Sequence, residues 1–261
     1  MSDQEVRLGG MALANGVLVH GPNSWGCAVR LPDGRLQVLA DYKRYRSSSV
    51  TNPLLRGPAR LAEVIALVPH VRRRMPEAKL PFERPRVLTA MVASAAAVQV
   101  ARGSKRLSPA AQELVGAVAS LVPAVLALRS DDLAAYHGAE HIAIGSHEHG
   151  EAREKEHERC GSHLLGPLLA TLTIGNVLAA RAPVHLRTPA RALASLGAVA
   201  ASTEIFSWMV RHPENRVAKA LAKPGHEIQH RLATAEPTPE QLEVAEAALA
   251  ACLELEHGSQ D

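Results

Sequence analysis

Short runs rich in β-branched residues dominate the chain up to about Asp41. "VLVHG", "WGCAVRL" and "RLQVLAD" are three such runs, and the "PDG" between the last two is a turn signal that favours a hairpin. From about Pro53 the pattern changes, because leucine, valine and isoleucine recur at steps of three and four residues, the period of a helix. The pattern therefore predicts a small β-hairpin or sheet at the N-terminus, followed by helices.

Four apolar stretches follow a basic, proline-broken segment, "RRRMPEAKLPFERPR", at residues 72–86. The four stretches cover residues 87–101, 114–128, 164–180 and 190–210. Taken in pairs, they predict two antiparallel helical hairpins and hence a mainly α fold with a small N-terminal sheet element. Two consecutive hairpins would bring the basic segment, the histidine-rich stretch and the C-terminal segment to the same end of the molecule.

The apolar stretches leave two environments open. A helix that crosses a bilayer needs about 20 apolar residues, and the first two stretches supply about 15 each. The third contains Asn176, and the fourth contains Arg191 and Glu204. The stretches are therefore either membrane helices or buried helices of a soluble cytoplasmic bundle. If they are membrane helices, the basic residues of segment 72–86 place that end of the molecule in the cytoplasm by the positive-inside rule.

These changes of pattern predict three regions along the chain. Residues 1–58 form a small β-rich region, residues 59–86 a helix with a basic linker, and residues 87–261 a helical hairpin bundle with a histidine-rich metal loop at 129–163. The segment "TPEQLEVAEAALAACLELE" predicts a C-terminal amphipathic helix. Thr238 would be its N-cap, Pro239 its first residue, and Gln241 the second half of a capping box.

Composition and charge narrow the classes of protein. Hydrophobic residues make up 47% of the chain but aromatic residues only 3%, so small aliphatic side chains must fill the core, which favours close-packed helices. The net charge of +3, from 29 basic and 26 acidic residues, is too balanced for a protein that binds nucleic acid through its phosphates. Three widely spaced cysteines and an N-terminus without signal-peptide features indicate a reducing, cytoplasmic setting.

The stretch from Tyr136 to His163 holds six of the chain's thirteen histidines. Within it, "HGAEH" places His137 and His141 four residues apart, so that both rings project from one face of a helix at the separation that two ligands of one zinc ion need. Glu140 lies beside them. In this inverted zinc-hydrolase spacing, His-x-x-Glu-His, the carboxylate can act as general base toward water on the metal.

Further ligands follow in "HERC", where His157 and Cys160 stand three residues apart, a step that predicts one side of a helical turn. Four protein ligands would make a closed, structural zinc site, whereas three would leave a position open for catalysis. His147 and His149, in "SHEHGEAREKEHE", fit a charged, solvent-exposed connection, or an exchangeable second metal site.

Two other groups compete for a role at a metal. "HEIQH" places His226 and His230 at the forward zincin spacing with Glu227 between them, although an exposed helix face explains the same pattern. Glu204 lies inside an apolar stretch, where a carboxylate is costly unless it is paired or bound to a cation. It is a remote metal ligand, a partner of Arg211 about two turns on, or a side chain that reaches the surface of the bundle.

With these motifs in view, the chain resembles the YqhQ-like family, described as predicted metal-dependent membrane enzymes of bacteria. The likeness is carried by "GGMALANGVLVHGP", "AVRLPDGRL", "PLLRGPARLAEVIAL", "YHGAEH", "HERCG" and "EPTPEQLEVAEAAL", and so extends over nearly the whole chain. It implies that the apolar stretches are membrane helices. It also implies a functional core of Tyr136, His137, Glu140, His141, His157, Arg159, Cys160 and Gly161.

The chain departs from the family pattern at three positions. Asn15 stands where the family has Glu, His20 where it has Arg, and Glu158 where it has Pro, so any chemistry served by that Glu and Arg would be altered here. "HEIQH" falls where the family has a leucine-rich "PGL" run, and the resemblance does not support its histidines as ligands.

Three functions are consistent with these residues. The first is a membrane-associated hydrolase with a divalent metal, zinc by its donor set, held by His137, His141, His157 and Cys160, and with Glu140 as general base. The second is a non-catalytic membrane scaffold or partner-binding protein in which the same ligands close a structural zinc site. The third is a metal sensor or carrier.

Overall fold

The computed structural model describes residues 7–128 and 131–258. The strands are β1 (Gly9–Leu13), β2 (Gly16–His20), β3 (Ser24–Arg30) and β4 (Leu36–Tyr42). The α-helices are α1 (Pro53–Arg74), α2 (Pro85–Gly103), α3 (Pro109–Leu128), α4 (Asp131–His149), α5 (Leu165–Ala179), α6 (Arg187–Arg211), α7 (Arg216–Ile228) and α8 (Pro239–Gly258). Short 3-10 turns are η1 (Pro81–Glu83), η2 (Gly161–Leu164) and η3 (Val184–Leu186), and η4 (Gln229–Ala233) is a π-helical turn. The predicted mainly α fold with a small N-terminal sheet is confirmed.

The four strands form one antiparallel sheet in the order β1-β2-β3-β4, so each strand pairs with its neighbour in sequence. β1 was not predicted, because "GGMAL" lacks the β-branched residues that mark a strand. β2 and β3 are buried over nearly their whole length, which explains their continuous apolar runs. The sheet therefore needs cover on both faces.

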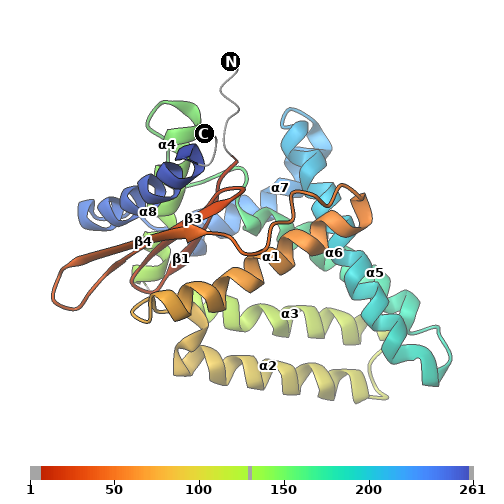
Figure 1. The fold of residues 1–261 in the computed structure, drawn as a ribbon. Coiled ribbons are helices and arrows are strands. Elements are labelled where there is room, and N and C mark those ends of the chain that lie inside the picture. The colour runs from red at the N-terminus through yellow and green to blue at the C-terminus, as the bar shows by residue number, and fades with distance from the viewer. Residues whose placement is uncertain (1–6, 129–130, 259–261) are drawn as a thin grey trace.

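Helices from distant parts of the chain supply that cover (Figure 1). On one face, α4 and α8 pack against Val17, Val19 and Ala28. On the other face, α1 and the segment after it pack against Leu18 and Trp25. Alternate residues of the same strand thus serve opposite cores, as the pleat of a strand requires. The position of α4 is therefore set by its packing against the sheet.

The C-terminal helix α8 begins as the sequence predicts. Thr238 Oγ1 accepts a hydrogen bond from the Gln241 backbone N–H at 3.3 Å, and Gln241 Oε1 accepts one from the Thr238 N–H at 3.0 Å. This is a complete capping box. At the other end of the helix, Glu256 is 2% exposed and accepts hydrogen bonds from the backbone N–H groups of Asn23 and Ser24 at 2.8 and 2.6 Å. α8 is therefore fastened to the sheet at its C-terminal end as well as along its length.

The four apolar stretches form the predicted hairpins, with α2 against α3 and α5 against α6 (Figure 1). A buried ion-pair cluster links them: Glu113 of α3 is 4% exposed and lies 3.1 Å from Arg102 of α2 and 3.4 Å from Arg191 of α6. This cluster lies near the hairpin connections, at the C-terminal end of α2 and the N-terminal ends of α3 and α6. The cluster holds the two hairpins together at the ends where α2 connects to α3 and α5 connects to α6.

Three helices in the described part of the chain are long and apolar enough to cross a membrane. They cover Ala110–Leu128, Gly161–Ala179 and Val184–Arg211, whereas α2, the helix of the first apolar stretch, is not among them. Large apolar side chains on these helices point outward, among them Leu114, Val118, Ile174 and Leu193. Contiguous exposed apolar surface of this kind is costly in water and is compatible with association with a membrane.

Candidate metal centre

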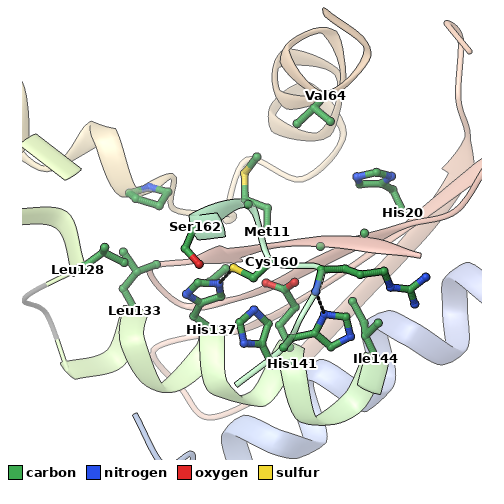
Figure 2. Close-up of a pocket in the computed structure, with 18 of the residues that line it drawn as sticks. Met11, His20, Val64, Leu128, Leu133, His137, His141, Ile144, Cys160 and Ser162 are labelled. Carbon is green, nitrogen blue, oxygen red and sulfur yellow. Dashed lines mark hydrogen bonds between the residues drawn. The ribbon is translucent and has the colours of Figure 1, made fainter. Parts of the chain in front are cut away.

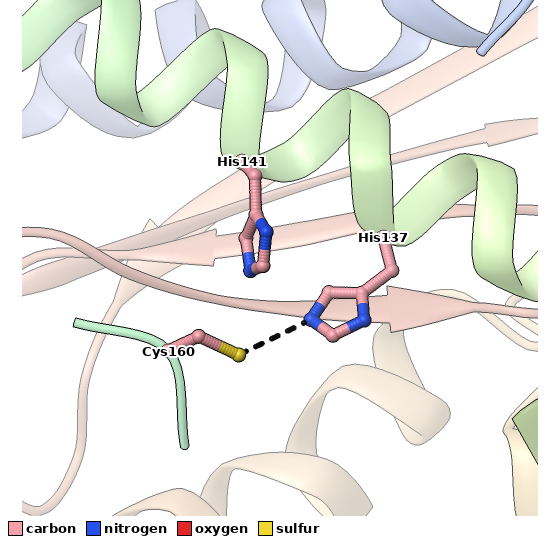
Figure 3. Close-up of side chains that lie close together, drawn as sticks. All are labelled: His137, His141 and Cys160. Carbon is pink, nitrogen blue, oxygen red and sulfur yellow. Dashed lines mark hydrogen bonds between the residues drawn. The ribbon is translucent and has the colours of Figure 1, made fainter. Parts of the chain in front are cut away.

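α4 presents the two histidines of "HGAEH" side by side. Their ring centroids lie 4.3 Å apart, and both rings point away from the helix axis toward the turn that carries Cys160 (Figure 3). The metal loop predicted at 129–163 is therefore largely helical: α4 covers Asp131–His149, and only the residues after His149 connect it to the Cys160 turn. Positions 129–130 of the predicted loop lie outside the described residues. The helix makes the spacing of the two rings rigid, because successive turns are held by backbone hydrogen bonds.

Cys160 faces these two rings from a separate segment of the chain (Figure 3). Its Sγ lies 3.6 Å from His137 Nε2, and one donor atom from each of His137, His141 and Cys160 falls within 4.8 Å of the other two. A zinc ion about 2.3 Å from sulfur and about 2.05 Å from nitrogen would set two such donors about 3.6 Å apart in a tetrahedron. The separation of Cys160 from His137 already fits a shared zinc ion.

Each histidine is oriented by a backbone carbonyl behind it. His137 Nδ1 lies 2.8 Å from the Ala233 carbonyl oxygen, and His141 Nδ1 lies 2.6 Å from the Lys155 carbonyl oxygen. A carbonyl can only accept, so both Nδ1 atoms carry a proton, and Nε2 is the atom of each ring that can bind a metal. This is the arrangement typical of metal-binding histidines, whose second nitrogen donates to a backbone or carboxylate oxygen.

Burial favours the metal-binding form of His141. The residue is 3% exposed, and this desolvation lowers the pKa of His141 below its usual range. The ring is therefore neutral near pH 7, with its Nε2 lone pair available.

The turn that carries Cys160 is held by one buried glutamine. Gln229 is 0% exposed; its Oε1 accepts a hydrogen bond from the His157 N–H at 2.9 Å, and its Nε2 donates to Ser162 Oγ at 2.8 Å. The two contacts lie on either side of Cys160 in the sequence. Gln229 begins η4, and Ala233, which orients His137, ends it. One short segment after α7 thus positions two of the three donors.

His157 does not belong to the three-donor set. The segment from His157 to Cys160 is a tight turn, closed by a 3.2 Å hydrogen bond from the Cys160 N–H to the His157 carbonyl, rather than the expected helical turn. His157 Nε2 lies 3.3 Å from Glu148 Oε2, and the same carboxylate pairs with Arg159. Burial alone would raise the pKa of Glu148, but the hydrogen bonds from His157 and Arg159 outweigh it and lower that pKa. The His157 ring centroid is 5.6 Å from that of His141, so His157 lies beside the cluster.

Glu140 is buried against the edge strand of the sheet. Its side chain lies directly over Gly10 of β1, where an added Cβ would collide with the carboxylate. Glu140 is 6% exposed, and this burial raises the pKa of its carboxyl, although His137 and His157 act in the opposite direction. A carboxyl whose pKa is raised is a better proton acceptor when it ionises, which suits acid–base chemistry.

The three donors and Glu140 open into one cavity of about 630 Å³ (Figure 2). Its walls come from β1, β2, α1, η1, α3, α4 and the Cys160 turn. Arg159 and His157 line it on the polar side. A volume of this size holds a small organic molecule, because ligand pockets commonly measure about 300 to 1,000 Å³.

The other predicted metal residues lie outside this cluster. Glu204 forms an ion pair with Arg56 of α1, a partner that was not among the alternatives predicted for it. His226 and His230 have stacked rings 6.3 Å apart, and His230 Nδ1 lies 2.9 Å from Glu156 Oε1 on the surface. In the described part of the chain, the three-donor cluster is the one group of at least three donor side chains close enough to share a metal.

A family profile matches the chain over residues 125–255, and its description is "Protein of unknown function (DUF1385)". The chain belongs to this family. No curated protein and no solved structure matches it. The DUF1385 match covers α4, the Cys160 turn and α5 to α7, and therefore all three donors and Glu140. The strands and α1, which complete the cavity, precede the matched region.

Outside the DUF1385 match, two departures from the YqhQ-like pattern have different surroundings. Asn15 Nδ2 donates to the Glu77 carbonyl at 3.1 Å, and Asn15 Oδ1 accepts from the Lys79 N–H at 2.9 Å, so Asn15 ties the β1–β2 turn to the linker. His20 lines the cavity and lies 3.1 Å from Lys43 Nζ. Tyr136, which the YqhQ-like resemblance includes in its functional core and which lies inside the DUF1385 match, is 6% exposed and packs in the core between the sheet, α4 and α8.

Sequence reasoning missed Gly10 and Gln229. Adjacent glycines at the start of β1 were the one signal for Gly10, because a missing Cβ permits close approach of another side chain. Gln229 gave no signal of its own, since its contacts to the Cys160 turn are made across the fold.

Proposed function

We propose that the protein is a membrane-associated, zinc-dependent hydrolase, in keeping with the YqhQ-like predicted metal-dependent membrane enzymes. The observation that carries the proposal is the meeting of three oriented donors and one buried carboxylate at a single cavity. Three protein donors leave one tetrahedral position free, which is typical of catalytic zinc sites. Two imidazoles with one thiolate also form a donor set that suits zinc better than magnesium or calcium.

The residues have separable roles in this proposal. His137, His141 and Cys160 would hold the metal, which when bound would supply a Lewis acid for water and for the bond to be broken. Glu140 would accept the proton of the attacking water and return it to the leaving group. Gly10 keeps room for the carboxylate beside the sheet. Ala233 and Lys155 would keep both rings in the tautomer that binds the metal.

Metal analysis of the purified full chain tests the proposal first. We expect about one zinc per chain, lost in His137→Ala and retained in His230→Ala, the matched control from the other His-Glu motif, whose side chain is 64% exposed. Cobalt substitution should give a thiolate-to-cobalt absorption band that disappears in Cys160→Ser. Protein without any transition metal, or an unchanged metal content in His137→Ala, would refute the proposal.

A structural zinc that fastens the Cys160 turn to α4 is the second candidate. It is favoured by the place of His157, whose ring lies 5.6 Å from that of His141 and would reach a fourth position by turning away from Glu148. Acetohydroxamate separates the two candidates, because it binds a metal with an open position and displaces nothing from a closed one. A spectral shift of the cobalt protein supports the hydrolase, and an unchanged spectrum supports the structural site.

The proposed orientation puts the site on the cytoplasmic side of the membrane. Segment 72–86, with six basic residues, precedes α2 at the cavity end of the hairpins, where Pro81 lines the cavity, and this favours the cytoplasm by the positive-inside rule. Lys105 is exposed in the loop at the opposite end, between α2 and α3. Lys105→Cys in intact cells should react with a membrane-impermeant maleimide, whereas Arg86→Cys should not. The reverse pattern would contradict the orientation.

A further inference from the structure

The cavity at the metal centre has two chemically different walls. His137, His141 and Cys160 belong to the polar wall (Figure 2). Glu140, His157 and Arg159 also line the cavity and complete this wall. The apolar wall comes from four elements of the fold, of which α4 also carries His137, Glu140 and His141. Its members are Met11 and Ala12 of β1, Val64 of α1, Ala124, Ala127 and Leu128 of α3, and Leu133 and Ile144 of α4. A small polar substrate alone would leave this apolar wall against water, which is unfavourable.

The apolar wall leads to a helix that is apolar enough to cross a membrane. Ala124 and Ala127 lie in the last turns of the candidate span Ala110–Leu128. Ala127 is 9% exposed whereas Ala124 is exposed, so the wall passes from the interior to the outer surface of α3 along one face of that helix. Two residues from Ala124, on the opposite side of the helix, Val122 is 43% exposed. The polar donors are thereby connected to a surface of α3 that is suited to hydrocarbon.

Helix α1 also reaches the cavity, through one residue. Val64 lines the cavity, and Leu61 and Ile65, which flank it on α1, are 48% and 61% exposed. Apolar side chains therefore border the cavity where α1 and α3 approach it. An apolar chain lying along α3 and β1 would remain in contact with apolar side chains from the surface of α3 to the donors.

We propose that the ligand of this cavity is an amphiphile, with its polar head at the three donors and a single apolar chain along the wall formed by β1 and α3. The proposal rests on the proposed function, because the head is placed by the metal. The volume of about 630 Å³ accommodates the head together with part of a chain, and the remainder extends toward the bilayer.

A series of alkyl hydroxamates tests the chain. The hydroxamate head binds the metal and stays constant while the alkyl group is lengthened from two to ten carbons, and binding is followed by the spectrum of the cobalt-loaded full-length protein in nanodiscs. Each added methylene buried in the cavity should lower the Kd roughly threefold to fourfold. The gain should level off once the chain extends beyond the cavity.

Two matched variants of α3 separate binding in the cavity from partition into lipid. Ala124→Phe fills the cavity entrance, and Val122→Phe places the same side chain on the opposite face. Partition into the nanodisc contributes equally in the wild type and in both variants. Ala124→Phe should therefore lose the part of the gain that comes from the cavity, and Val122→Phe should keep it. Both substituted positions are exposed, so folding should be retained. Ala127→Val, a smaller change deeper in the wall, should reduce the gain in part.

The outcomes distinguish this proposal from the proposed function. Acetohydroxamate binding with no gain for longer chains, or an equal gain in Ala124→Phe and Val122→Phe, overturns the amphiphile and leaves the open metal site in place. Absence of cobalt binding, or of any response to acetohydroxamate, refutes the catalytic metal site and the amphiphile with it.

Discussion

Replacement of Gln229 by leucine isolates the residue that holds the Cys160 turn. Leucine has nearly the volume of glutamine, so the substitution leaves no large cavity at a position that is 0% exposed. It removes the acceptor for the His157 N–H and the donor to Ser162 Oγ. The donor atoms of the metal centre are untouched. The variant therefore tests whether the turn is pre-organised for the metal by its surroundings.

The size of the effect follows from those contacts. Gln229 makes four side-chain hydrogen bonds, to the His157 N–H and carbonyl, to Ser162 Oγ and to His163 Nε2, and the two shortest, at 2.9 and 2.8 Å, flank Cys160. Each of these two costs about 1 kcal/mol when it is lost, so releasing the turn costs about 2 kcal/mol. If the metal must restore the turn when it binds, about 2 kcal/mol of binding free energy is lost, which is roughly thirtyfold in zinc affinity. Loss of outer partners of metal ligands typically weakens binding about 10- to 100-fold, which agrees with this figure.

Competition with a chelator of known zinc affinity measures the change in the purified full chain. Gln241→Leu is the matched control, since Gln241 makes the capping-box contact at the start of α8 and does not line the cavity. We expect zinc affinity to fall roughly thirtyfold in Gln229→Leu and to stay unchanged in Gln241→Leu. A Gln229→Leu protein that melts earlier than the wild type yet binds zinc within threefold of it would refute the reasoning, because Gln229 would then be merely a stabilising core residue.

Two further predictions concern the sheet and its contacts. Gly10→Ala should push the Glu140 carboxylate aside and lower the apparent melting temperature while leaving zinc content unchanged, whereas Gly103→Ala, which meets open space, should not. Glu256→Gln should destabilise the protein by about 3 kcal/mol in denaturant unfolding, because charge-assisted hydrogen bonds become neutral, with the exposed Glu254→Gln as control. Burial would raise the pKa of Glu256, but its hydrogen bonds outweigh burial and lower it. The wild-type advantage should therefore be full above about pH 5 and disappear as the pH falls through the folded-state pKa; an advantage that persists at low pH would contradict this assignment.

The elements that the sequence predicted are those whose signals are local. The hairpins follow from apolar stretches long enough to cover whole helices, and the α8 cap follows from three residues within one stretch of four, Thr238 to Gln241. The four-residue step in "HGAEH" placed His137 and His141 on one face of a helix for the same reason. The cap and the histidine pair are each decided within about two turns of chain, and each apolar stretch lies within a single helix, so the pattern alone contains them.

The rest of the candidate site depends on contacts between distant segments. The three-residue step from His157 to Cys160 fits both a helical turn and a tight turn, and the hydrogen bonds to Gln229, about 70 residues further on, decide between them. In the turn, His157 reaches Glu148 while Cys160 reaches His137. The local sequence of β1 likewise does not predict a strand, because β1 is placed by its pairing with β2 and by the close approach of Glu140 to Gly10.

The contrast between the two His-Glu motifs shows what spacing leaves undecided. In "HGAEH" both rings have a carbonyl behind Nδ1 and a thiol before Nε2, in a half-buried to buried setting. In "HEIQH" the rings stack at the surface, and His230 uses its Nδ1 on Glu156. Yet the second motif contributes to the first, since its glutamine, Gln229, holds the Cys160 turn. Equal spacing on a helix therefore makes two histidines available, and the polar atoms packed behind and before their rings determine whether they are prepared for a metal.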